Sequence, residues 1–223
     1  MKKIAVAAVL LLTGIVLTGC AAMKRAKIEE RFSRISEVYP TAKAEELFKK
    51  FPKGFEVRYT KKQYKNDVIY SHYFIMKGDS EAKNITGIYT KSKNSDSAPE
   101  NEEILRLPVT YTDEKGFQAV DGQNLEDDVK KIRFFFTQMP INTSYLHSLE
   151  IEAVTENPVS GTYVLYYRVN DKLINDYVGI PQDTSVTLQL GGNPKYNSSG
   201  KYYSTVSVQG DSNIYFFETI TAE

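Results

Sequence analysis

Three kinds of residue in this 223-residue sequence have the chemistry to form a reactive site. Cys20 is the single cysteine, and a lone thiol can be a nucleophile, half of an intermolecular disulfide, a core residue or an attachment point. His72 and His147 are the two histidines. The third kind comprises pairs of adjacent carboxylates, at Glu29-Glu30, Glu45-Glu46, Glu102-Glu103 and Asp127-Asp128.

The histidines and carboxylates follow no catalytic or metal-binding pattern. Neither histidine has another histidine or a carboxylate at metal-ligand spacing, so we expect no metal site. Neighbouring residues on a helix point in different directions, so adjacent carboxylates predict solvated faces rather than acid–base pairs. The sequence has no G-x-S-x-G nucleophile turn and no phosphate-binding glycine loop. We therefore predict no catalytic residue, no metal and no cofactor.

Cys20 follows a segment with the layout of a secretory signal. Lys2 and Lys3 precede an uncharged run over residues 4–17, and the small residues Thr18 and Gly19 come directly before the cysteine. The run is shorter than the roughly 20 residues that cross a bilayer as a helix. An uncleaved anchor over residues 4–22 is the alternative interpretation.

Leu17, Thr18, Gly19 and Cys20 together resemble a lipobox, the recognition site of bacterial lipoproteins. The resemblance implies cleavage of a signal peptide over residues 1–19, a diacylglyceryl group on the Cys20 sulfur and acyl chains such as palmitate. Whether the new amino group is also acylated stays open. Two acyl chains would hold a protein stably on a membrane. We therefore expect a lipid anchor on the extracytoplasmic side of the cell membrane, with residues 20–27 as a lipidated tether.

Composition narrows the class of the remaining chain. Basic and acidic residues are balanced at 28 each, which argues against a nucleic-acid binder. The length predicts one domain over residues 28–223, or a division near residue 122. The 16 tyrosines, many at alternating positions, indicate half-exposed sheet faces. A surface that stacks on carbohydrate is the alternative interpretation of these tyrosines.

Apolar residues spaced three or four apart predict helices. A helical pair is expected at the start of the domain, carried by Ile28, Phe32, Ile35 and Tyr39 and, after Pro40, by Ala44, Leu47, Phe48 and Phe51. A third helix, capped by Asn124, would carry Leu125, Val129, Ile132 and Phe136. The end of this segment, "KKIRFFF", could instead be a strand.

Alternating patterns predict the strands. They cover residues 55–59, 68–76, 85–90, 105–111, 117–120, 162–169, 184–190, 202–208 and 214–220. Residues 92–102 are polar and predict a loop, and residues 191–201 predict a long contact loop. The expected class is α+β, with an N-terminal helical pair and a further helix packed on a mainly antiparallel sheet.

Several stretches in order resemble the staphylococcal tandem lipoproteins, also called conserved staphylococcal antigens, a domain of unknown function. They are "IEERFSRISEVYP", "AEELF", "KKIRFFF", "NPVSGTYVLYYRVND", "GIP", "TLQLGG" and "IYFFETI". The resemblance implies a surface-anchored antigen of Gram-positive cells, from a family with members linked to host-cell invasion and immune stimulation. It implies no catalytic residue, and its one transferable site is the lipidated Cys20.

These observations favour a membrane-anchored, non-catalytic module that binds a host or envelope protein and no nucleic acid. The alternative is a cell-envelope enzyme with an unfamiliar active site. A cleft that brings His72 or His147 together with carboxylates would favour the enzyme.

Overall fold

The computed structural model describes residues 25–27, 29–65, 68–95, 98–193, 201–210 and 214–223. The chain divides into two units, residues 1–34 and 35–223. Unit one contributes a helical piece at residues 25–27 and an ion pair between Arg25 Nε and Glu29 Oε1 at 3.0 Å. All of the strands belong to the second unit.

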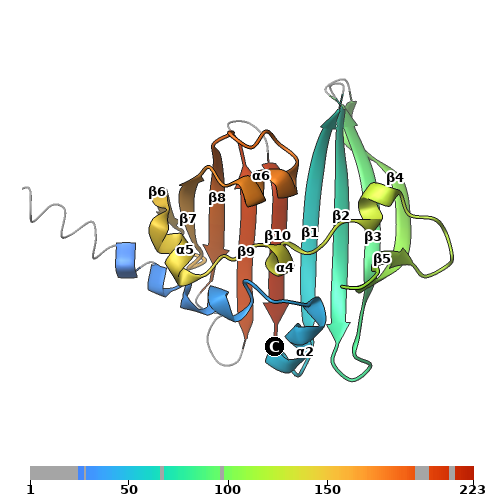
Figure 1. The fold of residues 1–223 in the computed structure, drawn as a ribbon, viewed down its shortest axis with the longest axis horizontal. Coiled ribbons are helices and arrows are strands. Elements are labelled where there is room, and N and C mark those ends of the chain that lie inside the picture. The colour runs from blue at the N-terminus through green and yellow to red at the C-terminus, as the bar shows by residue number, and fades with distance from the viewer. Residues whose placement is uncertain (1–24, 28, 66–67, 96–97, 194–200, 211–213) are drawn as a thin grey trace, which may run out of the picture. The chain divides into compact units, whose positions relative to one another are not determined.

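The second unit is built on one ten-stranded antiparallel sheet (Figure 1). Its strands are β1 (Phe55–Lys65), β2 (Val68–Asp79), β3 (Asn84–Ser95), β4 (Ala98–Thr112), β5 (Gly116–Ala119), β6 (Glu150–Glu156), β7 (Tyr163–Val169), β8 (Val186–Gly192), β9 (Tyr202–Gln209) and β10 (Ile214–Ala222). The spatial order is β5-β4-β3-β2-β1-β10-β9-β8-β7-β6. Two meanders, one from each half of the chain, therefore join where β1 pairs with β10.

The helices are short. They are η1 (Ser33–Glu37), η2 (Ala44–Glu46), α2 (Leu47–Lys50), α3 (Asp127–Lys130), α4 (Phe135–Gln138), α5 (Thr143–Ser148) and α6 (Lys172–Val178). The second unit is thus strand-dominated, and the expected α+β balance overstated its helices. The N-terminal helical pair is wrong in detail. Residues 25–27 and 29–30 are α-helical, η1 is a short 3₁₀ helix, and η2 and α2 are one short turn each, so the segment does not form two regular helices.

One face of the sheet is covered, and we call it the inner face. Figure 1 shows α2, α4, α5 and their connecting segments crossing in front of the strands. Side chains that point to this face are buried, while those on the opposite, outer face are half-buried or exposed, as in the alternating burial of β7 and β8. This alternation follows from the two-residue period of a strand. Among the described residues of the second unit, no helix lies on the outer face.

Aromatic rings fill the space under the covering segments. Phe74 and Phe117 stack with centroids 4.0 Å apart, and Tyr59 meets Phe216 edge to face at 5.3 Å. Phe134 lies against Tyr111 at 4.4 Å. All six of these side chains are at most 2% exposed, so the inner face is a packed core.

The predicted third helix is wrong beyond its first turn. α3 ends at Lys130, and Phe134, Phe135 and Phe136 are all fully buried. Consecutive residues on a helix point about 100° apart, so an amphipathic surface helix cannot bury three in succession. The chain instead becomes extended at Phe134 before the short α4. The predicted cap is also wrong, since Asn124 Oδ1 accepts from Lys130 Nζ at 2.7 Å.

The polar stretch 92–102 is strand at both ends rather than a loop, because β3 runs to Ser95 and β4 begins at Ala98. Lys93 pairs across the ladder with Glu102, so opposite charges face each other where both sides of the hairpin are polar. Strand β6, α5 and α6 were not predicted.

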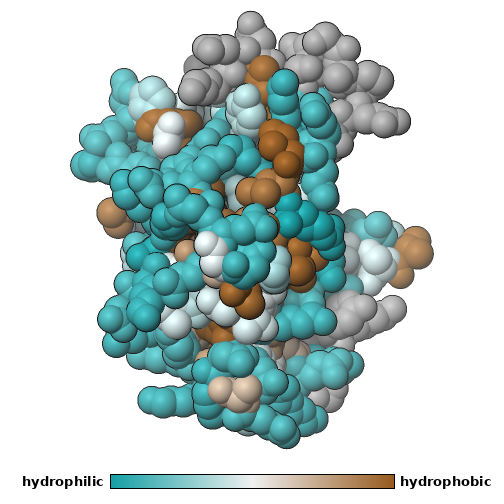
Figure 2. Space-filling model, turned by 90° about the vertical axis from the view of Figure 1, so that its right-hand side faces the viewer, coloured by the Kyte–Doolittle hydropathy of each residue, from teal (hydrophilic) through white to brown (hydrophobic). Residues whose placement is uncertain are grey.

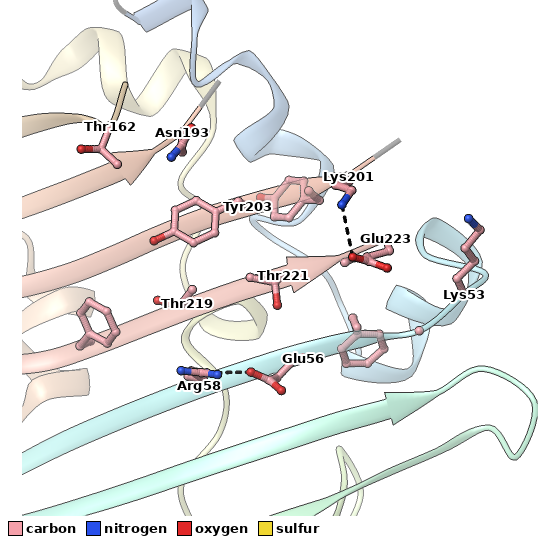
Figure 3. A pocket seen from close by; sticks show the side chains of 15 residues that line it. Lys53, Glu56, Arg58, Thr162, Asn193, Lys201, Tyr203, Thr219, Thr221 and Glu223 are labelled. Atoms are coloured by element: carbon pink, nitrogen blue, oxygen red, sulfur yellow. Dashed lines mark hydrogen bonds and ion pairs between the residues drawn. The ribbon is translucent and has the colours of Figure 1, made fainter. Parts of the chain in front are cut away.

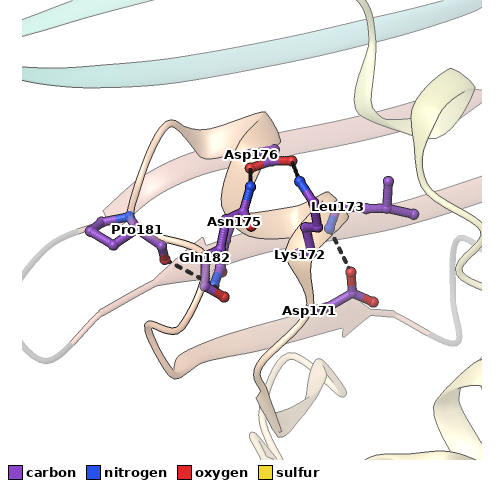
Figure 4. Close-up of polar contacts among 7 residues, drawn as sticks. All are labelled: Asp171, Lys172, Leu173, Asn175, Asp176, Pro181 and Gln182. Carbon is purple, nitrogen blue, oxygen red and sulfur yellow. Dashed lines mark hydrogen bonds and ion pairs between the residues drawn. The ribbon is translucent and has the colours of Figure 1, made fainter.

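Local side-chain bonds define α6 and the turn after it (Figure 4). Asp171 caps the helix by accepting from the Leu173 N–H at 2.8 Å, and Gly179 ends it with a positive φ of 80°. The fully buried Asn175 amide donates to three backbone carbonyls, those of Pro181, Gln182 and Thr184, at 2.8–3.2 Å. The turn is therefore attached to the helix that precedes it.

Candidate functional site

The lipobox residues Leu17, Thr18, Gly19 and Cys20 lie outside the described residues. Of the expected tether, the structure describes residues 25–27, which are helical. Within the described part of the chain, no helix combines the length and apolar character needed to cross a membrane.

His72 lies in the middle of β2, on the inner face. Its side chain is buried, and its Nδ1 is 2.9 Å from the hydroxyl of Tyr89. Lys61 and Lys91 flank it on the two neighbouring strands. Burial lowers the pKa of His72, while the negative charge of Asp128 acts in the opposite direction. A second acid, Glu126, forms an ion pair with Lys91 Nζ at 2.6 Å. The negative charge of Glu126 raises the pKa of His72 and the positive charge of Lys91 lowers it, so the two act in opposite directions.

The structure does not bring His72 and His147 together in a cleft. His147 lies in the last turn of α5 and is exposed. Neither histidine lines any of four hollows in the described part of the chain, which measure about 300 to 890 Å³. Among those residues, no group of three or more histidine, cysteine or acidic side chains is placed to hold a metal ion.

Glu45 departs from the expectation of a solvated carboxylate. It accepts from the Asp113 N–H at 3.2 Å, and Asp113 in turn accepts from the Ala44 N–H and from the Tyr111 hydroxyl. Burial, together with the hydrogen bond to Glu45, raises the pKa of Asp113 to about 6. These contacts join η2 to the turn after β4, which is a structural role.

Glu218 is the most deeply buried carboxylate in the described chain, and sequence reasoning missed it. It points to the inner face from β10 with no exposed surface. Its carboxylate accepts from the Tyr39 hydroxyl at 2.8 Å and from the N–H groups of Phe135 and Phe136 at 2.9 and 3.1 Å. Burial raises the pKa of Glu218 to about 8, although the three donors act to lower it. The signal in the sequence is an acid at an inward position between Phe216 and Ile220.

The outer face carries two adjoining hollows, of about 300 and about 890 Å³. Both are lined by Thr162, Tyr203 and Phe217. We call the joined feature the outer-face groove and define it by outward residues of β8, β9 and β10 with Thr162 beside them: Thr162, Gln189, Tyr203, Thr205, Phe217 and Thr219. Figure 3 shows the larger hollow, with Tyr203, Thr219 and Thr221 projecting from neighbouring strands.

Strand register explains why this face is hollow. One row across five strands consists of Val164, Gly191, Thr205, Thr219 and Arg58, and its three central members are small. The rows on either side contain the larger rings.

Phe217 lies on one side of the small row, paired with Ser207, and Tyr203 lies on the other, paired with Thr221. Phe217 is 37% exposed. Thr205 Oγ1 is 3.0 Å from Thr219 Oγ1 and 3.3 Å from the Tyr203 hydroxyl. The groove therefore combines a hydroxyl-lined floor with aromatic rings on both sides.

Four of the five charged residues that line the larger hollow form two ion pairs, and Lys53 is the fifth. Arg58 Nε lies 2.7 Å from Glu56 Oε1, and Lys201 Nζ lies 3.4 Å from Glu223 Oε1 (Figure 3). Both pairs line the larger hollow, and no charged residue lines the smaller one. The side chains of the smaller hollow are suited to hydrogen bonding and ring contacts.

The side of the second unit near β5 exposes several apolar residues but, among its described residues, no continuous apolar patch. Figure 2 looks onto the side of β5 and shows hydrophobic residues as a broken strip within a mostly hydrophilic surface. Ile104 and Val120 are exposed by 47% and 61%. Scattered apolar residues of this kind are normal on a protein surface.

The sequence predicted one component of the groove, its half-exposed tyrosine. The alternating tyrosines predicted half-exposed sheet faces, and Tyr203 is half-buried on the outer face. The predicted contact loop is described only at residues 191–193 and 201, where Gly191 and Gly192 belong to β8; residues 194–200 lie outside the described residues. Comparison with protein-family models and with curated proteins finds no match for this chain.

Proposed function

We propose that this chain is a lipid-anchored, extracytoplasmic binding protein without catalytic activity, and that its ligand surface is the outer-face groove. The groove is the observation that carries the proposal, because it combines volume, exposed rings and hydroxyl groups on a face that no described helix of the second unit covers. Membership of the staphylococcal tandem lipoproteins is part of the proposal and rests on the stretches quoted above.

The anchor rests on residues 17–20 and on the uncharged run before them. Lipidation of Cys20 would attach the chain through a thioether, and the acyl chains would enter the membrane. Because the sulfur is the only thiol in the sequence, modification would leave no thiol that could oxidise. The second unit would then face the cell wall and the exterior.

The sheet supplies a rigid platform for binding. In the centre of the sheet, β8, β9, β10 and β1 are paired on both sides, so their backbone groups are occupied by neighbouring strands. Recognition on this face therefore depends on side chains. A non-catalytic role agrees with the chemistry of those side chains, which offer hydrogen bonds and ring surfaces but no paired acid and base.

Mass spectrometry of the mature N-terminus tests the anchor. We expect the wild-type chain to begin at Cys20 with a diacylglyceryl adduct and to fractionate with membranes. A Cys20→Ala variant should lose the adduct and the membrane association together. An unmodified thiol, or a mature chain that retains Met1, would contradict lipid anchoring.

Co-sedimentation with an intact Gram-positive cell-envelope fraction tests the groove. Phe217→Ala removes an exposed ring from it, and Tyr166→Ala is the matched control, because Tyr166 also points outward but lines neither hollow. We expect Phe217→Ala to reduce the bound fraction and Tyr166→Ala to leave it unchanged. Equal binding by both variants and wild type would contradict a role for the groove.

A further inference from the structure

We infer that the outer-face groove binds an uncharged glycan chain, an inference that rests on the proposed function and names its ligand class. Three features of the groove support this assignment, namely its charge, its hydrogen-bonding groups and its rings. A fourth, the pairing of its strands, argues against the main competing ligand.

The first feature is that the charged residues are confined to the larger hollow and that, apart from Lys53, they form ion pairs with each other. The smaller hollow has no charged residue, and in the larger one Arg58 pairs with Glu56 and Lys201 with Glu223. Lys53 is the one other charged residue that lines either hollow. A polyanionic ligand would meet self-paired cations, and a cationic one would meet self-paired carboxylates. The charge pattern therefore complements a ligand without net charge.

The second feature is the type of hydrogen-bonding group on the floor. Thr162, Tyr203, Thr205 and Ser207 bring hydroxyls, and Gln189 brings an amide. A hydroxyl both donates and accepts, and an amide side chain offers one atom of each kind. Sugar hydroxyls have the same dual character. A ligand rich in hydroxyls can thus exchange its water contacts for equivalent contacts on this floor.

The third feature is the pair of rings. Phe217 and Tyr203 lie in the two rows beside the small central row, so both rings border the hollow. A ligand that covers the exposed part of the Phe217 ring would remove apolar surface from water, which is favourable by about 25 cal/mol per Å². A pyranose ring has faces made of C–H groups and an edge made of hydroxyls. Its faces would cover the aromatic rings while its edge met the hydroxyl floor.

An extended peptide is the main competing ligand, and the topology disfavours it. Peptides that add to sheets use the free backbone groups of an edge strand. The groove lies over β8, β9, β10 and β1, which are interior strands of the ten-stranded sheet. The two hollows also continue into each other, so the space suits a chain of several sugar units better than one ring.

Isothermal titration calorimetry of the full chain in detergent provides the test. The probes are chitotetraose and cellotetraose as uncharged glycans, a neutral glycine–serine peptide and the anionic polymer polyglutamate. We expect heat of binding with at least one glycan and none with the peptide or the polyanion. Binding of the peptide or polyanion alone, or of no probe, would overturn the glycan assignment.

Gly191→Val is the most informative variant. A Cβ at residue 191 would have its nearest contact with Thr205 Cβ at 3.4 Å, and the backbone there has no positive φ. Valine also favours strands, so we expect this variant to fold while its side chain fills the floor of the groove. Glycan affinity should fall by about tenfold or more, a loss of about 1.4 kcal/mol. Tyr203→Ala should weaken binding similarly, and Tyr166→Ala should not.

The two proposals fail in different ways. If Gly191→Val keeps its melting temperature and binds glycan like wild type, the groove is not the glycan site. If no glycan binds but Phe217→Ala still reduces binding to the intact envelope fraction, the binding function stands and the ligand class is wrong. If neither the glycan nor the envelope fraction responds to groove variants, both proposals fall.

Discussion

The two faces of the sheet are built from the same strands but differ in almost every property. Along β10, Phe216 and Glu218 point inward and have almost no exposed surface, whereas Phe217 points outward and is 37% exposed. The inner face contains packed rings and a buried carboxylate with three donors. The outer face contains small hydroxyl residues and ion pairs at the surface. Successive residues of one strand therefore serve stability on the inner face and, under the proposed function, binding on the outer face.

This separation means that the two roles can be tested independently. Inner-face changes should alter the free energy of unfolding, and outer-face changes should alter binding.

The neighbouring residues Phe216 and Phe217 give the sharpest contrast. Phe216→Ala removes a ring that contacts Tyr59, Phe135 and Tyr177, and should cost about 3–5 kcal/mol of unfolding free energy. Phe217→Ala should change stability by less than about 1 kcal/mol, because that ring is already partly in water. Urea unfolding of both variants measures the difference. Similar losses in the two variants would contradict the division between the faces.

Glu218 should make stability depend on pH. Its pKa is about 8 in the folded chain, above the ordinary value of 4.5, so folding favours the protonated form. This contribution is present in full below pH 4.5 and is lost as the pH rises through 8. Glu218→Gln should flatten the fall in unfolding free energy across this range. It should also lower stability by about 1–3 kcal/mol, because its NH₂ group cannot accept from a backbone N–H.

Tyr39→Phe is the control for that experiment. It removes a hydrogen bond that lowers the pKa of Glu218, so the fall in stability should extend to higher pH rather than disappear. If Glu218→Gln and wild type have the same pH profile, Glu218 does not titrate in this range.

His72 should contribute a weaker dependence of the opposite sign. Burial lowers its pKa from the ordinary 6.5, so the unfolded chain takes up a proton first as the pH falls. Stability should therefore decrease as the pH drops below 6.5. His72→Phe keeps a ring beside Tyr89 and should reduce this acid loss, as thermal unfolding at several pH values would show. An unchanged acid limb would contradict the assignment.

The ion pair on the outer face should matter least. Arg58 is more than half exposed, and exposed ion pairs contribute about 0–1 kcal/mol. Arg58→Ala should therefore change the melting temperature little. It should also leave binding to an uncharged glycan nearly unchanged at low and high salt. A strong, salt-dependent loss of binding would indicate an anionic ligand instead.

The sequence predicted the positions of several strands well and their long-range pairing poorly. The alternation of apolar and polar residues located β7, β9 and β10 to within two residues, because successive side chains of a strand point to opposite faces of the sheet. It could not predict that β1 lies beside β10, which are separated by most of the chain. The groove and the Glu218 contacts both depend on such distant neighbours.

The failed helix prediction has a related cause. The spacing of Leu125, Val129, Ile132 and Phe136 fits a helical face, but Phe134 and Phe135 are buried as well. Burial of Phe134 and Phe135 requires contacts from different parts of the second unit: Phe134 packs on Tyr111 of β4 and Phe135 on Phe216 of β10. The N–H groups of Phe135 and Phe136 then bond to Glu218, a partner that no local pattern reveals.

Methyl-group NMR of the full chain titrated with chitotetraose shows which face of the sheet contacts the ligand. Thr205 and Thr219 have methyl groups on the outer face, and Val206 and Ile220 have methyl groups on the inner face of the same two strands. We predict saturable shifts of the two threonine methyls, with little change at the valine and isoleucine methyls. Shifts confined to the inner-face methyls, or no shift at any of the four, would contradict the outer-face groove as the ligand site.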